Sequence, residues 1–227
     1  MKTLALFLVQ PKRAASRIKL KPHWLVAFLT LSALAVLAEH FLQPFALHDL
    51  YHHLPQSVTP HDRIEIEQDF HESAFSRLLF CPIRLFVGWG LFALVLYTVC
   101  RAIVPRERFR LQHIFAIEIH AEAANILARF AALVVLVIAR GSTGGNLLVP
   151  LGAEQLFRPS DLFTASILNS MNGFSLLYVV LLSASLEVIG GIGRLRAFFI
   201  VFVVWSISVL VNIGILALLR DEFHFSL

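Results

Sequence analysis

The chain has 227 residues, of which 58% are hydrophobic and only 15% are charged, and its mean hydropathy is +0.76. Soluble domains are about 45–50% apolar and about 25% charged, so these values argue against a soluble globular protein, a disordered chain and a coiled coil. Two cysteines are too few for a disulfide scaffold. The composition predicts an all-α polytopic membrane protein.

The first 23 residues are basic and precede the first long apolar segment. Their apolar run, Leu4–Val9, is shorter than the core of about 7–15 residues in a signal peptide. We therefore expect residues 1–23 to be a cytoplasmic amphipathic segment that lies on anionic lipid. The basic side chains expected at that membrane surface are Lys12, Arg13, Arg17, Lys19 and Lys21.

Five apolar segments are close to the length of about 20 residues that a spanning helix requires. Short connections between the second and third segments, and between the fourth and fifth, predict antiparallel packing of these neighbours. The five segments cover residues 24–42, 85–104, 114–139, 173–192 and 197–219 of a single membrane domain.

Two longer connections, residues 43–84 and 140–172, are expected to be outer loops. Within the first, Thr59-Pro60 is typical of a helix start, and a helix beginning there can run into the second span. Pro82 would then kink or end that helix near the membrane surface. In the second, Ser160 is followed by an apolar stretch, residues 161–171, that is too short to span and predicts a surface helix.

The distribution of Lys and Arg predicts the orientation of the chain. With the N-terminus inside, 12 of the 19 Lys and Arg residues lie on the inner side and six lie on the outer side. This excess agrees with the positive-inside rule, so we expect an inner N-terminus and an outer C-terminus. Because the basic residues flank apolar runs, the net charge of +4 does not indicate a nucleic-acid partner.

The third apolar segment carries polar residues that share one helical face. At 100° per residue, Glu118, Glu122, Asn125 and Arg129 form a single stripe. A charge in the centre of a bilayer costs about 2.5–3.5 kcal/mol on insertion scales, so these side chains require partners. Three interpretations remain open: ion pairing between helices, with Glu187 of the fourth segment as a further partner; a proton or ion path; and contact with a partner subunit.

Histidines gather in the first outer connection. His48 and His52 are four residues apart, and His53 follows, which is a spacing that can bind zinc or copper on one helical face. A solvated polar loop is the alternative. The chain has no G-x-S-x-G, S-x-x-K or Walker motif, so we expect neither an enzyme nor a bound cofactor.

Three stretches resemble segments of the bacterial Yip-domain (Ypt/Rab-interacting-protein-like) membrane proteins in the same order. They are PKRAASRIKLKPHWL, FSRLLFCPIRLFVGWGLFALVLY and ILNSMNGFSLLYVVLLSASLEVIGGIGRLRAFFIV. The resemblance implies five spanning helices and a cytoplasmic N-terminus. The chain departs from the family pattern at Glu187, where a small residue is expected, and in its more heavily charged third span.

Eukaryotic members of this family resemble adaptors for Rab-type GTPases. A bacterial chain has no Rab partner, so this function does not carry over to it. The resemblance therefore favours a non-enzymatic scaffold or accessory subunit of the bacterial cytoplasmic membrane, in contact with lipids and with other membrane proteins or a second copy of itself. The alternative is a small transporter or proton-coupled subunit that uses the third-span stripe.

Overall fold

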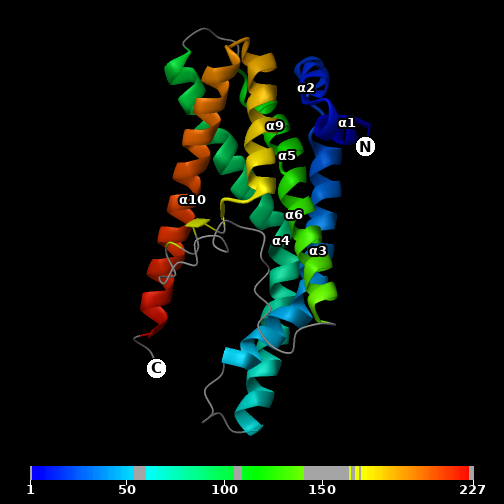
Figure 1. The fold of residues 1–227 in the computed structure, drawn as a ribbon, viewed down its shortest axis with the longest axis vertical. Helices are drawn as coiled ribbons and strands as arrows, with labels where there is room; N and C mark the ends of the chain where they lie inside the picture. The colour runs from blue at the N-terminus through cyan, green and yellow to red at the C-terminus, as the bar shows by residue number, and fades with distance from the viewer. Residues whose placement is uncertain are drawn as a thin grey trace.

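The computed structural model describes residues 2–53, 60–104, 109–140, 164, 167–168 and 170–224, without the side chains of residues 2, 48–53, 60, 62, 139–140 and 216–224. Every regular element in these ranges is an α-helix, and most helices run along the long axis of an upright bundle (Figure 1). Five of the helical segments described are long and apolar enough to cross a membrane. The all-α polytopic fold predicted from composition is confirmed.

The bundle is built from eight described helices. They are α1 (Lys2–Val9), α2 (Pro11–Leu20), α3 (Leu25–His53), α4 (Pro60–Ile103), α5 (Leu111–Ala121), α6 (Ala123–Arg140), α9 (Gly173–Gly190) and α10 (Arg194–His224). As the short connections predict, α4 packs against α5 and α9 packs against α10. Figure 1 places α1 and α2 towards the end of the bundle where α9 joins α10, and α10 runs from there to the opposite end.

The apolar spans agree with the predicted order but differ in length. They cover Leu25–Leu47, Arg63–Ile103, Leu111–Ile138, Gly173–Gly190 and Arg194–Ile215. The third span is two helices, α5 and α6, that meet at Glu122. The carbonyl oxygen of Glu122 still accepts a hydrogen bond from the amide of Ile126 at 3.0 Å, so the interruption is local.

Most of the connection predicted as an outer loop, residues 43–84, is helical. The helix α3 continues to His53, and α4 begins at Pro60, which stands at the first helical position as predicted. Pro82 lies inside α4 and does not end it. The predicted helix that runs from Pro60 into the second span is thus observed, whereas the extension of α3 to His53 was not predicted. Each residue added to a helix contributes one backbone hydrogen bond. Most of the predicted loop 140–172 lies outside the described residues. Within the predicted helix 161–171, the described residues 164, 167, 168 and 170 are helical.

Local sequence sets both ends of α9. The side chain of Asn172 accepts hydrogen bonds from the backbone amides of Phe174 and Ser175, at 3.0 and 2.9 Å, and so caps the first turn. Gly191 follows the last turn with φ 58°, in the left-handed conformation that glycine adopts without steric cost. The short basic connection can therefore turn the chain directly into α10.

The N-terminal helices pack against the bundle. Phe7 of α1 is 0% exposed, and Ala14, Ala15 and Ile18 of α2 are also buried. These two helices contact α5, α6 and α9. The apolar face of the segment is thus covered by protein, and contact of its basic face with anionic lipid stays a prediction. The basic side chains on the opposite face are exposed.

The core consists of two adjoining apolar clusters. The larger joins α1, α2, α4, α5, α9 and α10 around residues such as Leu96, Ile117 and Leu182. The second lies between α3, α4 and the third span and includes Phe28 and Trp89. Together they place the third span at the centre of the molecule, where it packs against α3, α4 and α9.

We predict that Gly190→Ala destabilises the bundle. A methyl group at Gly190 would collide with the ring of Phe109, which is buried in the larger cluster. Overpacking of this kind costs about 1–3 kcal/mol. The free energy of unfolding in detergent, measured by circular dichroism, should fall by that amount.

The matched control is Gly214→Ala in the interior of α10, where an added methyl group meets no described atom within 4 Å. Alanine is favoured over glycine in a helix by about 1 kcal/mol, so this variant should be at least as stable as the original chain. Equal losses in the two variants would contradict the close packing of Gly190 on Phe109.

Candidate functional site

The polar residues of the third span are distributed along its length. Glu118 lies on α5, Glu122 lies at the junction, and Asn125 and Arg129 lie on α6. With a rise of about 1.5 Å per residue, Glu118 lies roughly 10 Å and Arg129 roughly 27 Å from the start of α5 at Leu111. The polar residues therefore occupy successive levels of a bilayer core about 30 Å thick.

Glu118 meets a partner that the sequence analysis did not identify. The hydroxyl of Tyr178 on α9 lies 2.7 and 2.8 Å from the two carboxyl oxygens of Glu118 and donates a hydrogen bond to that group. Glu118 is 1% exposed and Tyr178 is 2% exposed, so the pair is closed off from the surroundings. This contact joins α5 to α9 in the centre of the bundle. The only sequence signal for it is a tyrosine within an otherwise apolar span.

Glu122 is half-buried at the junction of α5 and α6. Its carboxylate accepts a hydrogen bond from the side-chain amide of Asn125 at 3.1 Å, and the indole of Trp89 on α4 also interacts with it. Asn125 and Glu122 thus meet, as their shared face predicts. Arg129, however, forms its ion pair with a different acid.

That acid is Glu39 of α3, which the sequence analysis overlooked. Glu39 Oε2 lies 3.1 Å from Arg84 Nη2 on α4 and 3.8 Å from Arg129 Nη1 on α6. We call these three residues the Glu39 cluster. One carboxylate between two guanidinium groups connects three helices. Arg129 therefore pairs with Glu39 on α3, which packs beside α6, rather than with another residue of the stripe or with Glu187.

Glu187 is not part of the third-span stripe. It lies in the last turn of α9, where its Oε1 is 2.7 Å from Lys12 Nζ on α2. Beside it, Lys19 Nζ donates a hydrogen bond at 3.3 Å to the carbonyl oxygen of Val188. The last carbonyl groups of a helix lack partners within the helix, and cations there are stabilising. Two of the predicted surface lysines thus fasten α2 to the end of α9.

The face of α5 opposite Glu118 is closed by α1. His120 is 1% exposed, its Nδ1 lies 2.7 Å from the carbonyl oxygen of Ala116, and its ring centroid is 5.5 Å from that of Phe7. A histidine enclosed in this way serves the packing of α1 on the bundle. It does not extend the polar stripe.

The proposed metal ligands His48, His52 and His53 belong to the helical backbone of α3, but their side chains lie outside the described residues. Within the described part of the chain, no group of three or more His, Cys, Asp or Glu residues could hold a metal ion. Cys81 and Cys100 are free and buried, as expected of apolar thiols.

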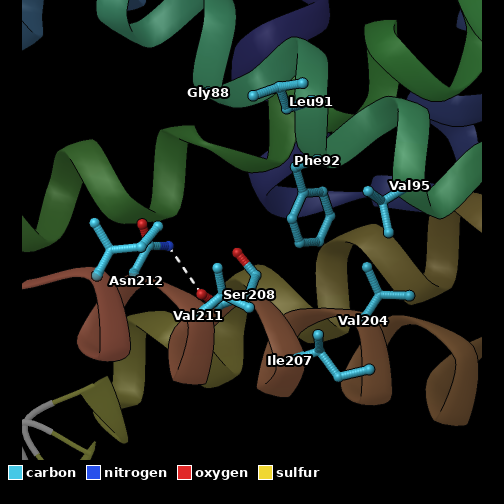
Figure 2. Close-up of a pocket in the computed structure, with 10 residues that line it drawn as sticks. Gly88, Leu91, Phe92, Val95, Val204, Ile207, Ser208, Val211 and Asn212 are labelled. Carbon is cyan, nitrogen blue, oxygen red and sulfur yellow. Dashed lines mark hydrogen bonds between the residues drawn. The ribbon is translucent and has the colours of Figure 1, made fainter. Parts of the chain in front are cut away.

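A groove of about 330 Å³ lies between α4 and α10 (Figure 2). Four residues of α4, beginning at Gly88, line it with helical spacing, and six residues of α10, from Val204 to Ile215, face them. The lining is mainly apolar. Its polar members are Ser208 and Asn212, and the amide of Asn212 donates to the carbonyl oxygen of Ser208 at 2.9 Å.

Five helical segments able to span a bilayer by length and composition, with polar contacts that join α3 to α4 and α6 and join α5 to α9, are those of a multi-pass membrane protein. Comparison with known proteins adds no narrower class, because no protein-family model, curated protein or solved structure matches the chain. The resemblance to Yip-domain proteins therefore stays a prediction.

We predict that Tyr178→Phe lowers the stability of the protein, because it leaves the buried carboxyl group of Glu118 without its donor. An unsatisfied buried group of this kind costs about 1–3 kcal/mol. The change should appear as a lower free energy of unfolding in detergent, and it should shrink when Glu118 is also replaced by leucine.

The matched control is Tyr97→Phe. The hydroxyl of Tyr97 accepts a hydrogen bond from Arg101 at 3.0 Å at an exposed site, where such a change alters stability by about 0.5 kcal/mol or less. If the two Tyr→Phe variants behaved alike, the contact between Glu118 and Tyr178 would have no special structural role.

Proposed function

We propose that this chain is a non-enzymatic membrane scaffold or accessory subunit, akin to Yip-domain proteins, which binds another membrane protein. The observation that carries the proposal is the groove between α4 and α10. It combines an apolar, helically spaced lining with two polar side chains on a face of the bundle. The intramembrane acids, by contrast, have partners within the chain.

The occupant that best fits the groove is a transmembrane helix of the partner. The lining residues of α10 extend over 12 positions, or about 16 Å of helix, and those of α4 follow the same i, i+3, i+4, i+7 spacing. A third helix can lay its side chains between these two ridges. A methyl group added at Gly88 would meet no described atom within 4 Å, so a partner backbone can approach closely there.

The polar members of the groove supply specificity. The amide of Asn212 uses one donor on Ser208 and retains a second N–H and a carbonyl oxygen. Hydrogen bonds between side chains of different helices stabilise association in membranes by about 0.6–2 kcal/mol. A partner helix with a polar residue at this level is therefore favoured over a purely apolar one.

The internal polar contacts support a scaffold more than a transporter. Both oxygens of Glu118 lie against Tyr178 in a fully enclosed position, and Glu39 is held between two arginines. Groups fixed in this way bind helices to one another. Of the two groove-forming helices, α4 is held by Arg84, and α10 packs against α9, which carries Tyr178.

We predict that Gly88→Trp abolishes partner binding by filling the groove with an indole ring. Affinity purification in mild detergent, followed by mass spectrometry and reassembly from purified components, should identify a stable membrane-protein partner of the original chain. Its retention should drop at least tenfold in Gly88→Trp. Val134→Trp on α6, an equally exposed position outside the groove, should retain the partner.

Three outcomes would overturn the proposal. The first is an original chain that stays monomeric and without a partner. The second is a Gly88→Trp variant that binds as well as Val134→Trp. The third is a groove that retains only phospholipid, which would make it a lipid site. A second copy of the chain as the bound component would instead identify the scaffold as self-assembling.

A proton-coupled subunit is the second candidate, and one observation favours it. Glu118 and Glu122 are one helical turn apart inside the third span, and Tyr178 contacts the first of them. If they carry protons, Glu122→Gln should reduce proton flux into reconstituted vesicles at least tenfold without changing the amount of folded protein. Flux equal to that of the original chain would eliminate this candidate.

A further inference from the structure

A cavity of about 310 Å³ lies where the two N-terminal helices meet the connection to the first span. It is lined by Thr3, Arg17, Ile18, Leu20, Lys21 and His23. Arg17, Leu20, Lys21 and His23 are exposed, so the cavity opens to the surface. No acidic residue lines it, and two of its walls are permanently cationic side chains. This chemistry suits an anion.

The basic residues of α2 fall into two sets. Lys12 and Lys19 are bound to the end of α9, and Arg13 donates to the side chain of Gln10 at 2.8 Å. Arg17 and Lys21 form no ion pair with any residue in the described ranges, and these are the two that face the cavity. Arg17 and Lys21 are therefore the basic side chains of the segment that are available to a ligand in the cavity.

Backbone geometry holds these cations together. Arg17 and Lys21 are four residues apart on one face of the helix end, and the amide of Lys21 donates to the carbonyl oxygen of Arg17 at 2.9 Å. Immediately afterwards the amide of His23 donates to the carbonyl oxygen of Lys21 at 2.8 Å. This tight turn brings the imidazole of His23 to the same cavity as the two cations.

The position of the cavity indicates which anion it meets. The apolar helix α3 begins at Leu25, two residues after His23, so the cavity lies beside the first residues of a candidate membrane span. Leu20, on its wall, is 83% exposed. In water this exposure is unfavourable, whereas beside an acyl chain it is favourable. A cationic cavity with an apolar lip at this level fits a phospholipid rather than a free ion.

We propose that this cavity is a binding site for the headgroup of an anionic phospholipid. Arg17 and Lys21 contact the phosphate, Thr3 and His23 offer hydrogen bonds to the headgroup, and an acyl chain lies along Leu20. The site is separate from the groove between α4 and α10, so it does not depend on the proposed scaffold function.

The test uses the full chain in nanodiscs of phosphatidylcholine with or without 20% phosphatidylglycerol. Native mass spectrometry after release should find phosphatidylglycerol retained by the original chain in preference to phosphatidylcholine. The double variant Arg17→Gln/Lys21→Gln should retain about 30-fold less, because each basic residue near an anionic surface contributes roughly fivefold to binding. Circular dichroism checks that the variant is folded.

The matched control removes the same charge from the same end of the bundle. Arg194 and Arg196 are exposed at the start of α10 and do not line the cavity. Arg194→Gln/Arg196→Gln should keep most of its bound phosphatidylglycerol. Equal losses in the two double variants would mean that general attraction, and not this cavity, binds the lipid, and would overturn the proposal.

Inorganic phosphate provides the second arm. If 10 mM phosphate displaced phosphatidylglycerol, or stabilised the protein against heat as strongly as the lipid does, the site would belong to a free anion and the lipid assignment would fail. Equal retention of phosphatidylcholine and phosphatidylglycerol would also overturn it. A loss of phosphatidylglycerol confined to Arg17→Gln/Lys21→Gln, with no effect of phosphate, supports it.

Discussion

A carboxyl group enclosed in an apolar bundle must be met by a donor, and Tyr178 meets Glu118 in this way. The contact also determines how two helices pack on each other. It sets the register of α5 against α9, and α9 in turn carries α10 on one side and the end of α2 on the other. A bilayer offers no water to replace a lost partner, so each polar side chain within it restricts the possible arrangements of the helices.

The Glu39 cluster applies the same constraint on the other side of the third span. Here one acid and two arginines join α3, α4 and α6, the helices that surround the second apolar cluster. Glu118 thus joins helices of the larger apolar cluster, and Glu39 joins helices of the second cluster. The groove between α4 and α10 is lined by other residues, so neither Glu118 nor the Glu39 cluster takes part in it.

The sequence was sufficient for the number and order of the spans, because long apolar runs have few alternatives. It failed where the decisive partner lies on another helix. A helical projection shows which residues of α5 and α6 share a face, yet it cannot show that Tyr178 or Glu39 faces them. For the same reason Glu187 was grouped with the third-span stripe only because it is a charged residue in a predicted span. In the structure it pairs with Lys12 at the end of α9.

The N-terminal segment illustrates a different limit. An amphipathic pattern predicts that one face will be buried, but lipid and protein satisfy that pattern equally well. In α2 the buried face meets protein, and the charged face remains at the surface together with Leu20 at the helix end. Residues 43–53 show the converse case, because a helix that extends beyond the apolar sequence leaves no clear hydrophobic signal, whereas the helix from Pro60 was predicted from its start signal.

The fastening of α2 to α9 also bears on how the molecule is made. Lys12 and Glu187 are 175 positions apart, so one side of this ion pair is synthesised long before the other. At translation rates of about 5–20 residues per second, the interval is roughly 10–35 s. During that time α2 has no α9 to cover its apolar face, and a membrane surface is the nearest apolar phase. Until α9 has been made, α2 can adopt the surface-bound arrangement that the sequence predicts.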